Sequence, residues 1–308
     1  MKYDVTFPSN GLTIAGHLYV PDDKTRRTGA AVVIGHPMGA VKEQSPAVYA
    51  EPLVREGFTV LTFDAGYQGE SSGEPRYLED PIQRAEDVKS GVSFLTTREE
   101  VDPERIGVLG ICASGGYVPF AAQTDHRMKA VATVSGADVG GLWRNGMDGK
   151  QAEEVIQTQL DQAAVDRSDE AKGQPARVIP LVPETKEQSE AFPPRSLFRE
   201  AWEYYRTPRA QHPRSVNRWV ARSVDKIAQF DAYEHVDMIS PRPLLMIAGT
   251  EADSARFSQE TIEKAREPKE LFWIDGASHV DLYDKPEYVG PAATKIVSFF
   301  KQHLVATS

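Results

Sequence analysis

Hydrophobic residues along this chain follow two patterns, alternating near the amino terminus and continuous further on. Residues 3–7 and 12–20 alternate apolar and polar positions on either side of a Ser-Asn-Gly turn, which predicts an antiparallel hairpin. Six short apolar runs follow, and runs of this kind are typical of strands buried on both faces of a parallel sheet. These runs are residues 30–34, 59–63, 106–109, 130–134, 243–248 and 270–274.

Helical spacing of apolar residues occurs between these runs. Residues 45–55, 81–94 and 288–304 each carry it, and a short helix is expected after the run at 106–109. Because strands alternate with helices, the sequence predicts an α/β fold with a mostly parallel central sheet.

The strand pattern stops between residues 136 and 233, where the chain becomes polar and helix-prone. We predict that this stretch is a helical cap inserted into a core made of residues 1–135 and 234–308. The cap should lie over the carboxyl ends of the strands, where open α/β sheets bind ligands. Most of its aromatic residues are explained by packing against the sheet, and Trp143 and Trp202 are our candidates for substrate contact.

Composition excludes several classes of protein. The 308 residues are 40% hydrophobic and 26% charged, as in ordinary globular proteins. The formal net charge of −10 argues against a nucleic-acid or anionic-membrane partner. A single cysteine rules out an internal disulfide. No apolar run approaches a membrane span, and residues 1–10 lack the pattern of a signal peptide, so we expect a cytoplasmic protein without a membrane partner.

That cysteine, Cys112, lies in the segment VDPERIGVLGICASGGY at residues 101–117. A buried strand here runs into a turn crowded with small residues, the composition that a nucleophile elbow needs around its strained central residue. Counted from Gly110, the nucleophile position falls on Cys112. A reading shifted by two residues places Ser114 there instead, and a third reading makes Cys112 a buried structural residue.

A nucleophile of this kind needs a base, an acid that orients it, and donors for the oxyanion. In elbow enzymes the acid and then the histidine follow the nucleophile along the chain. Asp253, with Glu251 as the alternative, follows the run at 243–248, and His279 follows the run at 270–274. The expected oxyanion donors are the backbone N–H groups of Ala113 and Met38.

The remaining motifs are explained by local structure and do not point to a cofactor or metal site. His36, beside Met38, is expected to brace its loop by hydrogen bonds, although it is also a candidate pocket residue, as is Tyr67. The glycines after Cys112 do not form a dinucleotide-binding motif, and no histidines and carboxylates have metal-ligand spacing. We therefore expect no cofactor and no metal.

Taken together, these motifs resemble the α/β-hydrolase superfamily, and more narrowly its dienelactone-hydrolase-like branch, whose elbow reads G-x-C-x-G-G. The sequence is also similar to bacterial and fungal α/β-hydrolases that carry HP-x-G-x-x-KEQ, FDA-x-x-QGES-x-G and HVDLYD. Here these texts stand at residues 36–44, 63–73 and 279–284. Ser114 stands where dienelactone hydrolases have glycine, and the cap is larger than theirs. The resemblance implies an α/β-hydrolase fold with an inserted cap.

We therefore expect a hydrolase that cleaves an ester, thioester or lactone of a small, largely apolar substrate through an acyl-enzyme on Cys112. One alternative is a serine esterase or peptidase that uses Ser114. Another, from a different class, is a ligand-binding or lyase-like protein that forms no acyl-enzyme. The sequence leaves the oligomeric state open, with a homodimer as one alternative.

Overall fold

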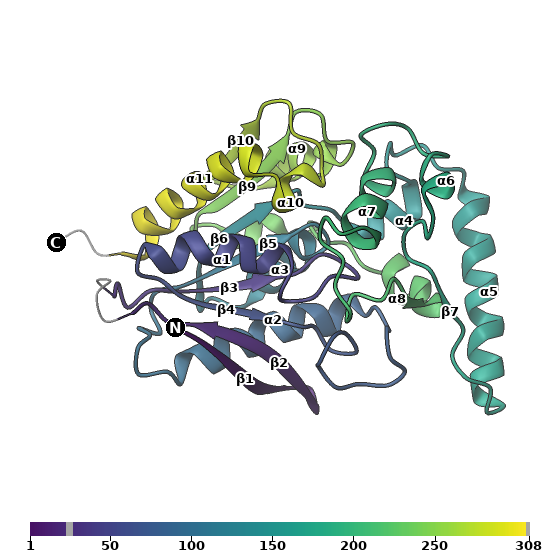
Figure 1. Ribbon diagram of the computed structural model, residues 1–308, viewed down its shortest axis with the longest axis horizontal. Helices are drawn as coiled ribbons and strands as arrows, with labels where there is room; N and C mark the ends of the chain where they lie inside the picture. Colours follow the sequence, from purple (N-terminus) through teal and green to yellow (C-terminus); the bar gives the residue numbers. More distant parts are fainter. Residues whose placement is uncertain (23–26, 306–308) are drawn as a thin grey trace.

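A mixed sheet of eight strands forms the centre of the computed structural model, which describes residues 1–22 and 27–305 (Figure 1). The strand order is β1-β2-β4-β3-β5-β6-β9-β10. The first two strands form the predicted antiparallel hairpin, β2 pairs antiparallel with β4, and the other neighbours are parallel. The strands are β1 (Lys2–Ser9), β2 (Leu12–Tyr19), β3 (Ala31–Gly35), β4 (Thr59–Phe63), β5 (Ile106–Ile111), β6 (Met128–Val134), β9 (Leu244–Gly249) and β10 (Lys269–Ile274).

Helices cover both faces of this sheet. Val32 and Ile34 of β3 pack in one buried cluster, whereas Val33 between them packs in the other. Every residue of β3 is buried, which explains its continuous apolar run. The first cluster includes α1 (Ser45–Arg55), α10 (Asp281–Asp284) and α11 (Pro286–Leu304), and the second includes α2 (Pro81–Thr96), α3 (Ser114–Thr124) and α9 (Ala255–Lys264).

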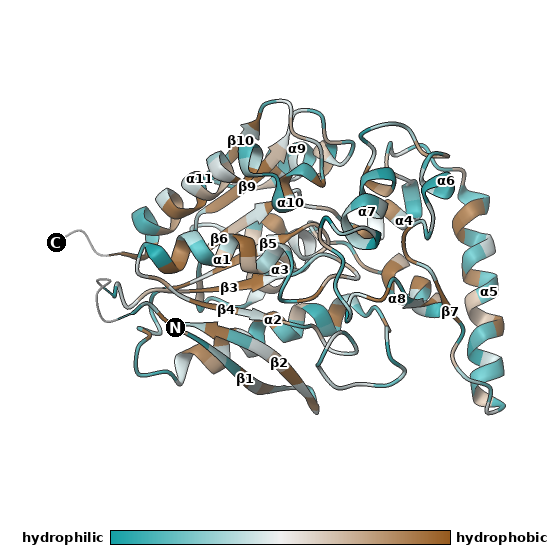
Figure 2. Ribbon diagram, in the orientation of Figure 1, coloured by the Kyte–Doolittle hydropathy of each residue, from teal (hydrophilic) through white to brown (hydrophobic). Residues whose placement is uncertain are grey.

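Most of the chain between β6 and β9 lies at one end of the sheet, on the right in Figure 1, with α5 outermost. Figure 2 shows α5 as mostly hydrophilic and the central strands as mostly hydrophobic. The elements of this segment are α4 (Val139–Asn145), α5 (Glu153–Ala171), β7 (Val178–Ile179), α6 (Lys186–Ser189), α7 (Leu197–Arg206), β8 (Trp219–Val220), η1 (Ala221–Ser223), α8 (Val224–Ala228) and η2 (Val236–Ile239).

Two strands in this segment correct the expectation of a purely helical stretch. β7 and β8 pair antiparallel, with Ile179 opposite Trp219. Each strand is only two residues long, so neither can show the alternation by which a strand is recognised in sequence. None of the helices in the two described stretches of the chain is long and apolar enough to cross a membrane.

The turn from β5 into α3 brings three segments of backbone very close together. The strand continues two residues beyond its predicted end, to Ile111, and α3 begins at Ser114. A Cβ atom added at Gly110 would lie 2.0 Å from the backbone oxygen of Ser114, a distance that no side chain tolerates. A Cβ atom at Gly115 would lie 2.5 Å from the Cα atom of Gly136. Glycine at both positions is therefore a steric requirement of the turn.

We expect Gly110→Ala to lower the free energy of unfolding by about 2 kcal/mol or more, because the turn cannot absorb the added methyl group without moving its backbone. Gly290→Ala is the matched control, since nothing lies within 4 Å of a Cβ atom there. In its helix, alanine should be neutral or stabilising by up to about 1 kcal/mol. Urea unfolding followed by circular dichroism compares the two variants, and equal midpoints would contradict this account of the turn.

Candidate active site

Cys112 occupies the centre of the turn between β5 and α3, with a backbone φ of 56°. This left-handed conformation is strained for a residue with a side chain, and neighbouring hydrogen bonds hold it in place. The Cys112 N–H donates to the carbonyl oxygen of Val134 over 3.0 Å, and the Cys112 carbonyl accepts from the N–H groups of Gly115 and Ala137. The residue as a whole is partly exposed. This is the backbone geometry that a nucleophile elbow requires at its central residue.

Ser114, the alternative nucleophile, lies at the start of α3 with its hydroxyl turned toward the loop after β3. Its Oγ donates a hydrogen bond of 2.6 Å to the carbonyl oxygen of His36, and the residue is buried. Ser114 has an ordinary helical position and not the strained one. In this arrangement its side chain ties two loops together.

Two backbone N–H groups approach the sulfur of Cys112, and they belong to Met38 and Ala113. Met38 is in the loop after β3 and Ala113 directly follows the cysteine, and both residues line the same small cavity as the thiol. Apolar surroundings raise the pKa of the Cys112 thiol, and a hydrogen bond from Tyr283 together with these N–H groups opposes that rise. Paired N–H donors at an elbow can stabilise an oxyanion.

His279 lies in the loop after β10 and is completely buried. One ring nitrogen, Nδ1, is 2.5 Å from the Oγ of Ser254, and the other, Nε2, is 3.0 Å from the hydroxyl of Tyr283. Burial lowers the pKa of His279 to about 3, so its imidazole is neutral at physiological pH. The sequence did not identify Ser254, which stands next to the predicted acid in the loop after β9.

The two candidate acids differ in environment. Glu251 is exposed. The Asp253 Oδ2 atom accepts a hydrogen bond of 2.9 Å from the N–H of Leu197 in α7, whereas its Oδ1 atom is buried without a hydrogen-bond partner among the described residues. Burial raises the pKa of Asp253, although the N–H groups of Leu197 and Ser254 oppose this effect. Within residues 1–22 and 27–305, no hydrogen bond joins Asp253 or Glu251 to His279.

Two further contacts tie α7 to the loop that carries His279. The hydroxyl of Ser278 donates to the carboxylate of Glu200 over 2.5 Å. Just before α7, the guanidinium group of Arg195 donates to Asp281 over 3.2 Å. Together with the bond from Leu197 to Asp253, these contacts connect one end of α7 to the loops after both β9 and β10.

The thiol of Cys112 faces a cavity of about 50 Å³ whose walls are almost entirely apolar. Its walls come from the loops after β3, β5 and β10, and from the segment between β6 and β9. Two tyrosines that the sequence did not single out, Tyr205 and Tyr283, also line it. The hydroxyl of Tyr205 is buried and has no hydrogen-bond partner within the part of the chain that the structure describes. The cavity wall comprises Met38, Cys112, Ala113, Ala137, Val139, Leu142, Trp143, Leu181, Val182, Leu197, Phe198, Ala201, Tyr205, Val280 and Tyr283.

Of the four candidate pocket residues, Trp143 lines this cavity, whereas Tyr67, Trp202 and His36 do not. His36 is fully buried and braces its loop as expected, since its Nε2 accepts from the N–H of Ala65 over 3.0 Å and its Nδ1 contacts the carbonyl oxygen of Pro37. Burial, and secondarily the charge of Arg84, lowers the pKa of His36 well below its ordinary value.

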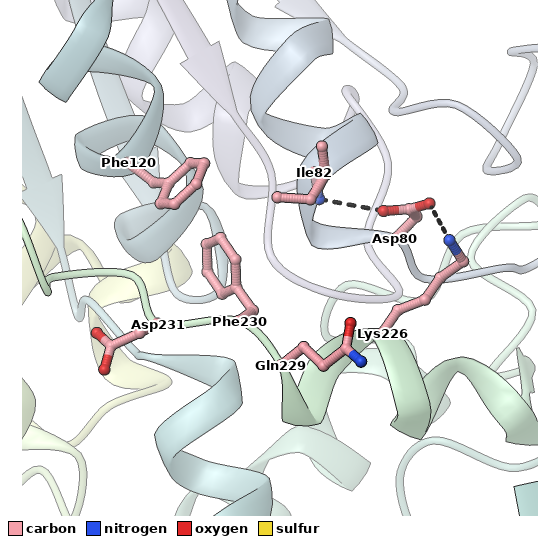
Figure 3. Close-up of a pocket in the computed structure, with 7 residues that line it drawn as sticks. All are labelled: Asp80, Ile82, Phe120, Lys226, Gln229, Phe230 and Asp231. Atoms are coloured by element: carbon pink, nitrogen blue, oxygen red, sulfur yellow. Dashed lines mark hydrogen bonds and ion pairs between the residues drawn. The ribbon is translucent and has the colours of Figure 1, made fainter.

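A larger cavity of about 440 Å³ lies elsewhere, between α2, α3 and α8 (Figure 3). Its walls are mixed, because an ion pair of 2.7 Å between Asp80 and Lys226 lies near the packed rings of Phe120 and Phe230. It contains neither Cys112 nor His279. The strained cysteine and its surrounding donors are in the smaller cavity.

Comparison with known proteins places this arrangement in a family context. The family model described as the alpha/beta hydrolase family matches residues 32–292. The uncharacterised protein YcjY of Escherichia coli K12 is 36% identical over 99% of this chain and 100% of its own length. PA2218 of Pseudomonas aeruginosa is 37% identical over 97% of this chain and 80% of its own. The crystal structure of PA2218 superimposes with a TM-score of 0.91, and the match covers 99% of this chain and 94% of the PA2218 chain.

A third relative carries a functional name. Polyketide transferase GrgF from a Penicillium species is 25% identical over 98% of this chain and 97% of its own length. The crystal structure of GrgF superimposes with a TM-score of 0.81 and covers 99% of both chains. The match to the family model over most of the chain, together with the full-length relatives and the fold, shows that the chain belongs to the alpha/beta hydrolase family, as its sequence motifs predict.

Proposed function

We propose that this member of the alpha/beta hydrolase family cleaves an ester, thioester or lactone by forming an acyl-enzyme on Cys112. The observation that carries the proposal is the position of the thiol at the strained centre of the elbow, where the N–H groups of Met38 and Ala113 approach its sulfur. A carbonyl carbon attacked by that sulfur would place its oxygen within reach of the same two donors.

The reaction begins with the transfer of the thiol proton toward His279, whose neutral imidazole is the form that can accept it. The thiolate of Cys112 then attacks the substrate carbonyl and forms a tetrahedral intermediate. When this intermediate collapses, the leaving group takes up the proton and departs, and the acyl group stays bound to Cys112 as a thioester. Water, activated by the same imidazole, releases the acid and restores the thiol.

Asp253 is our proposed acid. A buried carboxylate oxygen without a partner is costly, and Oδ1 of Asp253 is such an atom in the described structure. The cost is offset if positive charge forms nearby during the reaction, as it does when His279 becomes an imidazolium. In the resting state the hydroxyl of Ser254 holds the imidazole in place.

The substrate's acyl part is expected to be apolar, because the walls around Cys112 are aliphatic and aromatic apart from two tyrosine hydroxyls. The cavity is small, at about 50 Å³. The name of GrgF, a polyketide transferase, supports transfer of the acyl group to an acceptor other than water as the second candidate reaction.

A slowly hydrolysed p-nitrophenyl ester should give a burst of one equivalent of nitrophenol, and mass spectrometry should locate the acyl group on Cys112. Cys112→Ala should abolish both results. Ser114→Ala is the matched variant and should retain the burst, because the hydroxyl of Ser114 is engaged with the backbone of His36. Acylation of Ser114, or turnover by Cys112→Ala, would overturn the assignment in favour of a serine esterase, and the absence of any burst would favour a binding protein.

His279→Ala should lower turnover by about 10⁴-fold or more, as loss of a catalytic base does in enzymes of this kind. We expect Asp253→Asn to lower it by about 10²-fold, since it removes the negative charge of the proposed acid, and Ser254→Ala by only about 10-fold, since it removes a neutral hydrogen bond. Steady-state kinetics on one ester compares these variants with Glu251→Gln. A larger loss in Glu251→Gln than in Asp253→Asn would transfer the acid role to Glu251.

Burial of neutral His279 should also make stability depend on pH. The imidazole titrates near 6.5 when the chain is unfolded and at about 3 when it is folded, so the unfolded state binds the extra proton between these values. The stabilisation is fully present above pH 6.5 and is lost as the pH falls, by about 2 kcal/mol at pH 5. Urea unfolding at pH 7 and pH 5 should show this extra loss in the wild type relative to His279→Gln, and parallel losses would contradict it.

A further inference from the structure

The hydroxyl of Tyr283 lies between the proposed nucleophile and the proposed base. It is 3.0 Å from Nε2 of His279, and it lines the same cavity as the thiol of Cys112, whose pKa it lowers by hydrogen bonding to the sulfur. Within the described residues, no direct hydrogen bond joins Cys112 to His279. The proton that must move from sulfur to imidazole therefore has a phenol on its path.

The hydrogen bonds around His279 favour one direction along this path. With a neutral ring, Nδ1 can donate to the Oγ of Ser254, which leaves the lone pair of Nε2 facing the O–H of Tyr283. When the phenol donates to Nε2, the lone pairs of its oxygen are free to accept from the S–H of Cys112. Donors and acceptors are then aligned in one chain, from S–H to O–H to Nε2.

Tyr283 is also held rigidly in this position. It lies on α10 and is almost fully buried, with its ring packed edge-on against that of Tyr204 at a centroid distance of 5.1 Å. The hydroxyl of Tyr49 donates to the carbonyl oxygen of Leu282, the preceding residue, over 2.7 Å. A phenol fixed from both sides is preorganised to transfer a proton without first rearranging.

We propose that Tyr283 is a catalytic residue that relays the proton between Cys112 and His279. This proposal rests on the proposed function, because it assigns the route by which the acyl-enzyme forms. As the S–H bond breaks, the proton passes to the Tyr283 oxygen while the phenolic proton passes to Nε2. The products are a thiolate, a neutral tyrosine and an imidazolium, and the reverse transfer protonates the leaving group.

The environment of Tyr283 suits a concerted transfer. Burial, together with the nearby cysteine and tyrosines, raises the pKa of its phenol well above the ordinary value, so a free phenolate is disfavoured. In the relay the oxygen gains one proton as it loses another, and the tyrosine carries no charge in either end state. The high pKa therefore keeps the relay in its protonated, working form.

The test measures how fast iodoacetamide alkylates Cys112 at pH 7, a reaction of the thiolate that needs no substrate. We expect Tyr283→Phe to slow alkylation by about 10²-fold, in the range typical of lost acid–base assistance, and His279→Gln to slow it to a similar extent. The double variant should be no slower than either single one, because both interrupt the same path. Tyr288→Phe on α11, which makes the same change outside the cavity, should react at the wild-type rate.

Wild-type alkylation in mixtures of H₂O and D₂O gives a second measurement that does not depend on whether a variant folds. Two protons in motion give a curved dependence of rate on deuterium fraction, and one proton gives a straight line. A straight line, a wild-type rate in Tyr283→Phe, or additive losses in the double variant would each overturn the relay. Absence of turnover on every ester and thioester would overturn the proposed function but would leave the alkylation result to decide the relay.

Discussion

The arrangement around Cys112 depends on one steric constraint, the close approach of backbone in the turn between β5 and α3. The chain reverses within a few residues there, and it can do so only because Gly110 and Gly115 present no side chain to the backbone beside them. That reversal forces φ of Cys112 to 56°. The same turn brings the N–H of Ala113 toward the sulfur and points the hydroxyl of Ser114 toward the neighbouring loop. The positions of the proposed nucleophile, of the proposed oxyanion donor and of the serine that anchors the loop therefore follow from one backbone conformation.

Burial determines the charge state of the site. Both Cys112 and His279 are in apolar surroundings that disfavour their charged forms, so the resting pair is a thiol and a neutral imidazole and not an ion pair. In the proposed reaction, thiolate and imidazolium must then be created together, in the step in which each can stabilise the other. Such surroundings protect the cysteine from oxidation and alkylation at rest, because the thiolate is the reactive form.

Much of the fold could be predicted from the sequence, because buried parallel strands such as residues 31–35 are continuous apolar runs with little ambiguity. The elbow could be located because it directly follows such a strand. The loop containing His279 could be located because it follows the apolar run of β10, although this edge strand is only partly buried and not fully buried as predicted. Ser254 could not be, since a serine beside an aspartate gives no signal for which side chain faces the ring. Tyr283 is four residues beyond His279, and only the short helix α10 turns its hydroxyl back toward that histidine.

The contacts of α7 have a mechanical consequence. Leu197, Glu200 and the preceding Arg195 are bonded to the loops that hold Asp253 and His279, so this helix cannot be displaced without breaking those bonds or dragging the loops with it. The wall that α7 forms is thus coupled to the positions of Asp253 and His279, and a molecule that displaced this helix would shift the proposed acid and the proposed base with it.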